Sequence, residues 1–143
     1  MRIFSFIIFL ALVSGCEHPA GKLTDFGGQY PTKLAARIAA ADSIIVTSYF
    51  ALIDKERRDI RFVITGATVG KIVRAVSDAG RLQAQVDNIP SWNLEFYRGT
   101  NSLDSISFEG HIFNYGGEHY EQYSDGSKVL ENLDAELTER VKK

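Results

Sequence analysis

Histidine and glutamate side chains gather around a pair of glycines in the last third of the sequence. His111 and His119 lie on either side of Gly116-Gly117. A double glycine between two strand-like runs favours a tight two-residue β-turn. Three acids lie close by, Glu109, Glu118 and Glu121. Imidazole and carboxylate groups bind zinc and serve as general acids and bases, so this region is a candidate for a metal site or a hydrolase site.

The strand register decides whether these groups meet. A two-residue turn pairs His111 with Gln122 and His119 with Asn114, which places the imidazoles on opposite faces. A register shifted by one residue would gather both histidines with Glu109 and Glu121, because such a slip turns a whole strand over. The double glycine favours the first register, so we expect no metal site and no cofactor. A hydrolase that uses His111, His119 and the neighbouring acids is the alternative.

Other catalytic patterns are incomplete. The sequence GATVGK at 66–71 has a superficial similarity to a phosphate-binding loop. That motif needs four residues between its glycines and a Ser or Thr after the lysine, whereas here three residues intervene and Ile72 follows. Gly66 is better explained as the break between a strand and a helix. No Gly-x-Ser-x-Gly motif occurs either, so we expect no catalytic residue and no enzymatic activity.

The single cysteine, Cys16, follows an apolar N-terminal segment. Arg2 supplies a positive start, residues 3–13 are mostly apolar, and Ser14 and Gly15 are small. This order is typical of a secretory signal peptide. The apolar run is shorter than the about twenty residues that a membrane-spanning helix needs.

The sequence LVSGC at 12–16 resembles the lipobox of bacterial lipoproteins. The resemblance implies cleavage by signal peptidase II between Gly15 and Cys16, a diacylglycerol on the Cys16 thiol, and acylation of its new amino group. Two or more acyl chains anchor a protein stably in a bilayer. In this class an Asp after the cysteine favours the inner membrane. Glu17 therefore implies the outer membrane, facing the periplasm, in a Gram-negative cell.

The rest of the chain divides into a tether and one domain. Residues 16–28 carry the anchor and a Gly- and Pro-containing tether without apolar periodicity. Residues 29–143 have the size of a single domain. The chain is 45% hydrophobic and 24% charged, with a net charge of −2, and acids interrupt its densest basic run, KERRDIR at 55–61. This balance disfavours a nucleic-acid partner.

Apolar periodicity predicts an α+β domain. Helices are expected at 31–42, at 68–80 and in the tail 124–143, and strands at 43–50, 59–66, 92–97, 103–115 and 118–123, with weak alternation at 81–86. Short turns join most neighbouring strands. We therefore expect a mainly antiparallel sheet of about five strands with two to three helices packed on one face.

Aromatic side chains on the last strands suggest an interaction surface. Phe113 faces Tyr120 across the hairpin in the two-residue register, and exposed aromatic groups on an edge hairpin suit a protein contact. The predicted surface comprises Phe113, Tyr115, Tyr120 and His111, unless the C-terminal helix covers this face. We interpret the chain as a lipid-anchored envelope protein with a non-catalytic binding domain, whose partners are the membrane and another envelope protein. A purely structural envelope component is a further alternative.

Overall fold

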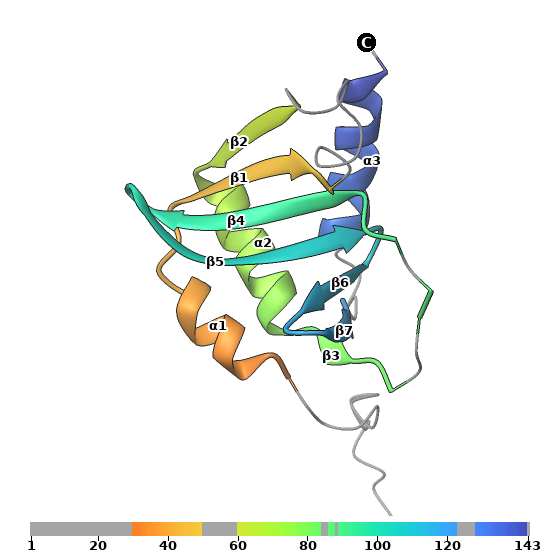
Figure 1. The fold of residues 1–143 in the computed structure, drawn as a ribbon. Coiled ribbons are helices and arrows are strands. Elements are labelled where there is room, and N and C mark those ends of the chain that lie inside the picture. The colour runs from red at the N-terminus through yellow and green to blue at the C-terminus, as the bar shows by residue number, and fades with distance from the viewer. Residues whose placement is uncertain (1–29, 50–59, 84–85, 88, 123–127, 143) are drawn as a thin grey trace, which may run out of the picture.

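The computed structural model describes residues 30–49, 60–83, 86–87, 89–122 and 128–142 (Figure 1). The helices within these residues are α1 (Thr32–Ile38), α2 (Ala67–Ser77) and α3 (Val129–Val141). The strands are β1 (Ser43–Ser48), β2 (Arg61–Thr65), β3 (Gly80–Arg81), β4 (Trp92–Arg98), β5 (Asn101–Glu109), β6 (Ile112–Tyr115) and β7 (Glu118–Glu121).

The strands described form one antiparallel sheet in the order β2-β1-β4-β5-β6-β7-β3. The three helices lie on the same side of this sheet, and its other side faces the viewer in Figure 1. The α+β class is therefore confirmed. The sheet contains seven strands in the described part of the chain, rather than the expected five or so.

The expected strand at 103–115 is in fact two strands, which accounts for part of the difference in number. Gly110 has a positive φ of 56°, a backbone conformation that glycine adopts without strain. The chain turns there, and Phe113 of β6 pairs back with Phe108 of β5. The other additional strand is the short β3, which pairs with β7 at the end of the sheet.

The double-glycine turn between β6 and β7 is confirmed. Gly116 and Gly117 have φ values of 60° and 84°, and positive φ at both central residues defines the type I′ turn that suits a hairpin. Asn114 pairs with His119 across this hairpin, and the N–H of Gln122 donates to the carbonyl of His111 at 2.9 Å. The register is therefore the two-residue one.

The apolar residues at helical spacing are buried against the sheet, as predicted. Val69, Ile72 and Val76 of α2 are buried, and Gly66, with a φ of 70°, forms the break between β2 and α2. In α3 a stripe of leucines is buried, Leu130, Leu133 and Leu137. The first helix is shorter than expected, because α1 ends at Ile38.

Two polar side chains fasten α3 to the sheet. Asp134 of α3 accepts hydrogen bonds from the Trp92 indole N–H at 2.8 Å and from the Gly110 N–H at 2.9 Å. The Gln122 side-chain oxygen accepts the Leu130 N–H at 2.9 Å. Leu130 lies in the first turn of α3, where backbone N–H groups have no partner within the helix. Gln122 therefore caps α3 from outside the helix.

Several predictions concern residues that the structure does not describe. They include the signal segment 1–15, the lipid site Cys16 and the tether 17–28, together with Phe50 and Tyr123. Among the described residues, no helix is long and apolar enough to cross a membrane.

Candidate binding surface

The predicted aromatic surface is wrong at its two central residues. Phe113 is completely buried and Tyr120 is 8% exposed. Their rings stack with centroids 5.3 Å apart, and both belong to the core on the helix side of the sheet. The turn at Gly110 explains the error. The prediction treated 103–115 as one strand, and the turn changes which face of the sheet the residues after it occupy. Phe113 therefore lies opposite the buried Phe108 and is not on a face shared with Glu109.

Phe113 belongs to an aromatic row that crosses four strands on the helix side. The strand registers align its members as direct cross-strand neighbours, in the order Trp92, Phe108, Phe113 and Tyr120. All four are buried. Aromatic pairs placed directly opposite one another are a main source of sheet stability. Burial also raises the pKa of Tyr120, with a smaller contribution from the charge of Glu118. This aromatic row thus belongs to the core.

The two histidines do not join the acids in one metal site within the described residues. His119 lies beside Asn114 on the helix-free face of the hairpin. His111 lies in the turn after β5, where its Nε2 is 3.1 Å from Glu121 Oε1. The zinc set of His111, His119, Glu109 and Glu121 is not assembled, and no group of three potential ligands is found among the described residues.

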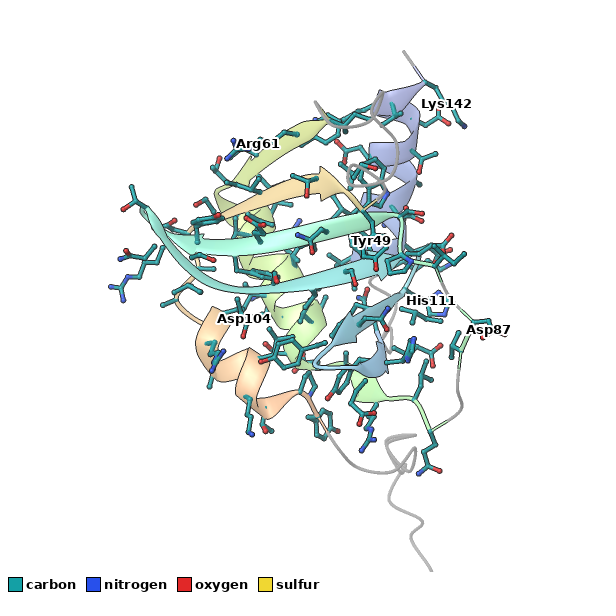
Figure 2. The ribbon with its side chains drawn as sticks, in the orientation of Figure 1. Tyr49, Arg61, Asp87, Asp104, His111 and Lys142 are labelled. Carbon is teal, nitrogen blue, oxygen red and sulfur yellow. The ribbon has the colours of Figure 1, made fainter. Side chains whose placement is uncertain are left out.

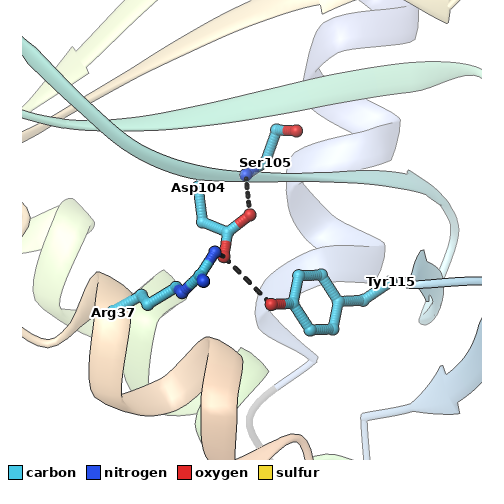
Figure 3. A network of polar contacts seen from close by, with 4 residues as sticks. All are labelled: Arg37, Asp104, Ser105 and Tyr115. Carbon is cyan, nitrogen blue, oxygen red and sulfur yellow. Dashed lines mark hydrogen bonds and ion pairs between the residues drawn. The ribbon is translucent and has the colours of Figure 1, made fainter.

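Tyr115 joins a polar network at the edge of the core (Figure 3). Its hydroxyl donates to Asp104 Oδ2 at 3.0 Å, and Arg37 of α1 donates to the same oxygen at 3.3 Å. The Asp104 side chain is 14% exposed and the Arg37 side chain 65%. Burial, followed by the hydrogen bond to Asp104, raises the pKa of the Tyr115 hydroxyl. The network ties α1 to β5 and β6.

The regular part of the β4–β5 hairpin gives Asp104 its position. Asp104 pairs with Phe96 in the register that also pairs Ile106 with Leu94, so it lies with Ile106 on the helix side, where it meets α1. The register shifts only after this pair, because Tyr97 pairs with Ser102 and Leu103 is the extra residue of a bulge.

The helix-free face carries a different kind of row, which we call the polar row. It contains one side chain from each of six neighbouring strands, aligned by the strand registers in the order Arg61, Thr47, Asn93, Ser107, Asn114 and His119. Strands lie about 4.8 Å apart, so the row extends over about 24 Å. In Figure 2, Arg61 lies on β2 at one edge, and His111 lies far across the sheet, beside β6 and β7.

The polar row is rich in groups that both donate and accept hydrogen bonds. Hydroxyl and carboxamide side chains have both capacities. Its four central residues are half-buried, and Arg61 is exposed. The Oδ1 atom of Asn114 is buried, and no described residue donates to it. Buried acceptors without a donor are uncommon in folded proteins. A molecule bound on this face would meet the half-buried hydroxyl and carboxamide groups of the row, whereas Asn114 Oδ1 itself lies below the surface.

The neighbouring positions on this face differ on the two sides of the polar row. On one side, Ile45 pairs with Val63 and with Glu95. Glu95 accepts a hydrogen bond of 2.7 Å from the Tyr97 hydroxyl. This bond is the largest of the effects that raise the pKa of Tyr97.

On the other side of the polar row, Ile112 pairs with Glu109 and with Glu121. The positions beside the row therefore add three acids to a polar face.

The polar row was not predicted from the sequence. Its members Thr47, Asn93 and Ser107 alternate with buried residues along their strands, and this alternation was a usable signal. Their alignment depends on pairing between strands that are distant in the sequence. Comparisons with known proteins add no further assignment: no family model matches the chain, and no curated protein or solved structure is significantly similar to it.

Proposed function

We propose that this protein is a lipid-anchored binding protein of the cell envelope, whose helix-free sheet face binds the partner. The sequence LVSGC at 12–16 supports the anchor, and Glu17 supports an outer-membrane location. The observation that carries the binding role is the polar row. It aligns hydrogen-bonding side chains from six strands on a face that no described helix or strand covers.

The arrangement favours binding over catalysis at this face. Catalytic sites bring a nucleophile or a general base within hydrogen-bonding distance of its partner groups. The polar row instead spreads its side chains at even strand spacing over a broad surface. Such a surface suits recognition of an extended polar partner, with several hydrogen bonds of modest individual strength.

The binding role can be tested by crosslinking in living cells. We would place the photo-reactive residue p-benzoyl-phenylalanine at Asn93, in the middle of the polar row. The matched control carries it at Ala135, an exposed position of α3. We expect a discrete adduct from position 93 and none from position 135. Equal adducts from both positions, or an adduct from position 135 alone, would contradict the proposed face.

The anchor is tested separately. Replacing Cys16 with Ala should abolish labelling of the protein by radioactive palmitate and release it from membranes, because the acyl chains supply the membrane affinity. Absence of palmitate from the unchanged protein would refute the anchor. It would leave the crosslinking result unaffected.

A further inference from the structure

The two edges of the sheet are protected to different degrees. At one edge lies β3, which has only two residues, and a very short edge strand offers little to pair with. At the other edge lies β2, with five residues of sequence RFVIT. Every edge strand presents a row of backbone N–H and C=O groups without strand partners. Among the described strands, β2 is therefore the one able to accept another strand along its length.

The sequence of β2 carries one charged residue, Arg61, and lacks the other devices that prevent such pairing. It contains no proline, no lysine and no glycine, and its pairing with β1 runs without a register shift. β-branched and aromatic residues, which favour strand pairing, make up most of it. Val63 lies at its centre and is 63% exposed. An added strand would cover this side chain.

An arginine lies on each side of this edge, near the start of β2. Arg61 projects from the helix-free face and is exposed. No acidic group within the described residues forms an ion pair with it. On the helix side, the guanidinium of Arg140 lies 5.4 Å from the ring centroid of Phe62 and pairs with Glu136. Two successive residues of an added strand point to opposite faces, so each would meet one of these arginines.

We propose that the β2 edge binds an extended segment of another protein by strand addition, and that this segment carries two successive acidic residues opposite Arg61 and Phe62. Backbone hydrogen bonds supply the affinity in this mode of recognition, and alternate side chains supply the selectivity. The positive groups at the edge favour an acidic partner over a second copy of this chain, because β2 itself carries no acidic residue that could meet them. This site shares Arg61 with the polar row and otherwise uses the backbone edge of β2, which the row does not.

A designed peptide provides the test. The probe has eight residues, with alternating threonine and valine followed by two glutamates. A matched control peptide ends in two lysines. Each is added to the full chain in detergent, and binding is followed by fluorescence anisotropy, with hydrogen exchange of the amides at 61–65 as the local readout. We expect the glutamate peptide to bind and to slow exchange in β2, and the lysine peptide to bind at least about fivefold more weakly, as rim charges allow.

Substitutions locate the site. Val63→Lys places a lysine in the middle of the edge strand. Lysine at such positions commonly prevents strand addition, so binding of the peptide should fall at least about tenfold. Arg61→Glu should weaken binding about five- to tenfold, as reversal of a rim charge allows. Arg98→Glu makes the same charge change at the distant β4–β5 turn and should leave binding unchanged. The replaced residues are exposed, and an unaltered circular dichroism spectrum confirms that the variants fold.

Several outcomes would overturn the proposal. They are absence of peptide binding, binding without protection at 61–65, equal binding of both peptides, and equal effects of the Arg61 and Arg98 substitutions. A dimer in sedimentation that Val63→Lys dissociates would assign the edge to a second copy instead. None of these results affects the crosslinking test at Asn93, so the two proposals fail separately.

Discussion

Ser107 and Phe108 are neighbours in β5, yet their surroundings differ completely. Phe108 is buried in the aromatic row beneath the helices, between Trp92 and Phe113. Ser107 lies on the helix-free face, between Asn93 and Asn114. The same strands and the same registers therefore build both rows. One row is apolar and covered by helices, and the other is polar and uncovered in the described structure.

This difference separates stability from recognition within one sheet. Burial of aromatic area stabilises the fold in proportion to the apolar surface removed from water. Half-exposed hydroxyl and carboxamide groups already bond to water, so their net contribution to folding is small. Substitutions on the helix side should therefore reduce stability, whereas substitutions in the polar row should alter binding and leave stability nearly unchanged.

The largest effect is expected from a substitution that interrupts the aromatic row. Phe108→Ala should lower the free energy of unfolding by about 3–5 kcal/mol, because it removes a fully buried ring and leaves a cavity. The matched control is Ser107→Ala, one residue away on the other face. This substitution should change the free energy of unfolding by less than about 0.5 kcal/mol. Urea unfolding followed by tryptophan fluorescence measures both. Similar losses in the two variants would contradict the comparison.

The next effect concerns the attachment of α3 to the sheet. Asp134→Ala removes the acceptor of two N–H groups, from Trp92 and Gly110, and should cost about 2–3 kcal/mol. Asp134→Asn retains one carbonyl acceptor, so its free energy of unfolding should lie between those of Asp134→Ala and the unchanged protein. Glu136→Ala, which removes an exposed ion pair on the same helix, should cost at most about 0.5 kcal/mol. If Asp134→Ala loses no more stability than Glu136→Ala, Asp134 does not attach α3 to the sheet.

A smaller effect is expected at the cap of α3. Gln122→Ala removes the acceptor of the Leu130 N–H, and loss of a helix cap costs about 1 kcal/mol. Thermal unfolding measured by circular dichroism at 222 nm provides the readout. Hydrogen exchange should accelerate first in the opening turn of α3. Uniform acceleration across the sheet would show that Gln122 acts elsewhere.

The smallest effect concerns Tyr115 and depends on pH. Tyr115→Phe removes the hydroxyl that donates to Asp104 and should cost about 0.5 kcal/mol at neutral pH. The pKa of this hydroxyl is raised in the folded protein. Its contribution to stability is therefore complete below the unfolded pKa of about 10 and declines as the pH rises through the folded pKa.

The stability of Tyr115→Phe should consequently fall less steeply above about pH 10 than that of the unchanged protein. Some alkaline decline should remain, because the pKa values of Tyr97 and Tyr120 are also raised. Parallel declines in the two proteins would show that Tyr115 titrates normally.

Local patterns predicted most of the elements and one register. The spacing of Val69, Ile72 and Val76 identified α2, because helical periodicity is a property of a short segment. Gly116 and Gly117 identified the β6–β7 turn and its register for the same reason. The strand order could not be predicted, since β1 lies between β2 and β4 through contacts that are distant in the sequence.

The candidate surface was harder to predict than the fold. The exposure of Phe113 was predicted wrongly because one glycine turn, at Gly110, changes which face the following residues occupy. The network around Asp104 depends on Arg37 of α1 and Tyr115 of β6, which are distant from it in the sequence or lie on another strand. The polar row depends on five consecutive registers. Each of these features requires knowledge of pairing partners as well as of local periodicity.

The central claim is that the polar row binds the partner. The most direct measurement is the yield of the crosslinked adduct from position 93, with Thr47→Ala and Ser107→Ala introduced together on either side of it. A loss of about 1 kcal/mol of binding energy would reduce the yield about fivefold, while the melting temperature stays the same. An unchanged yield in a folded double variant would contradict the account.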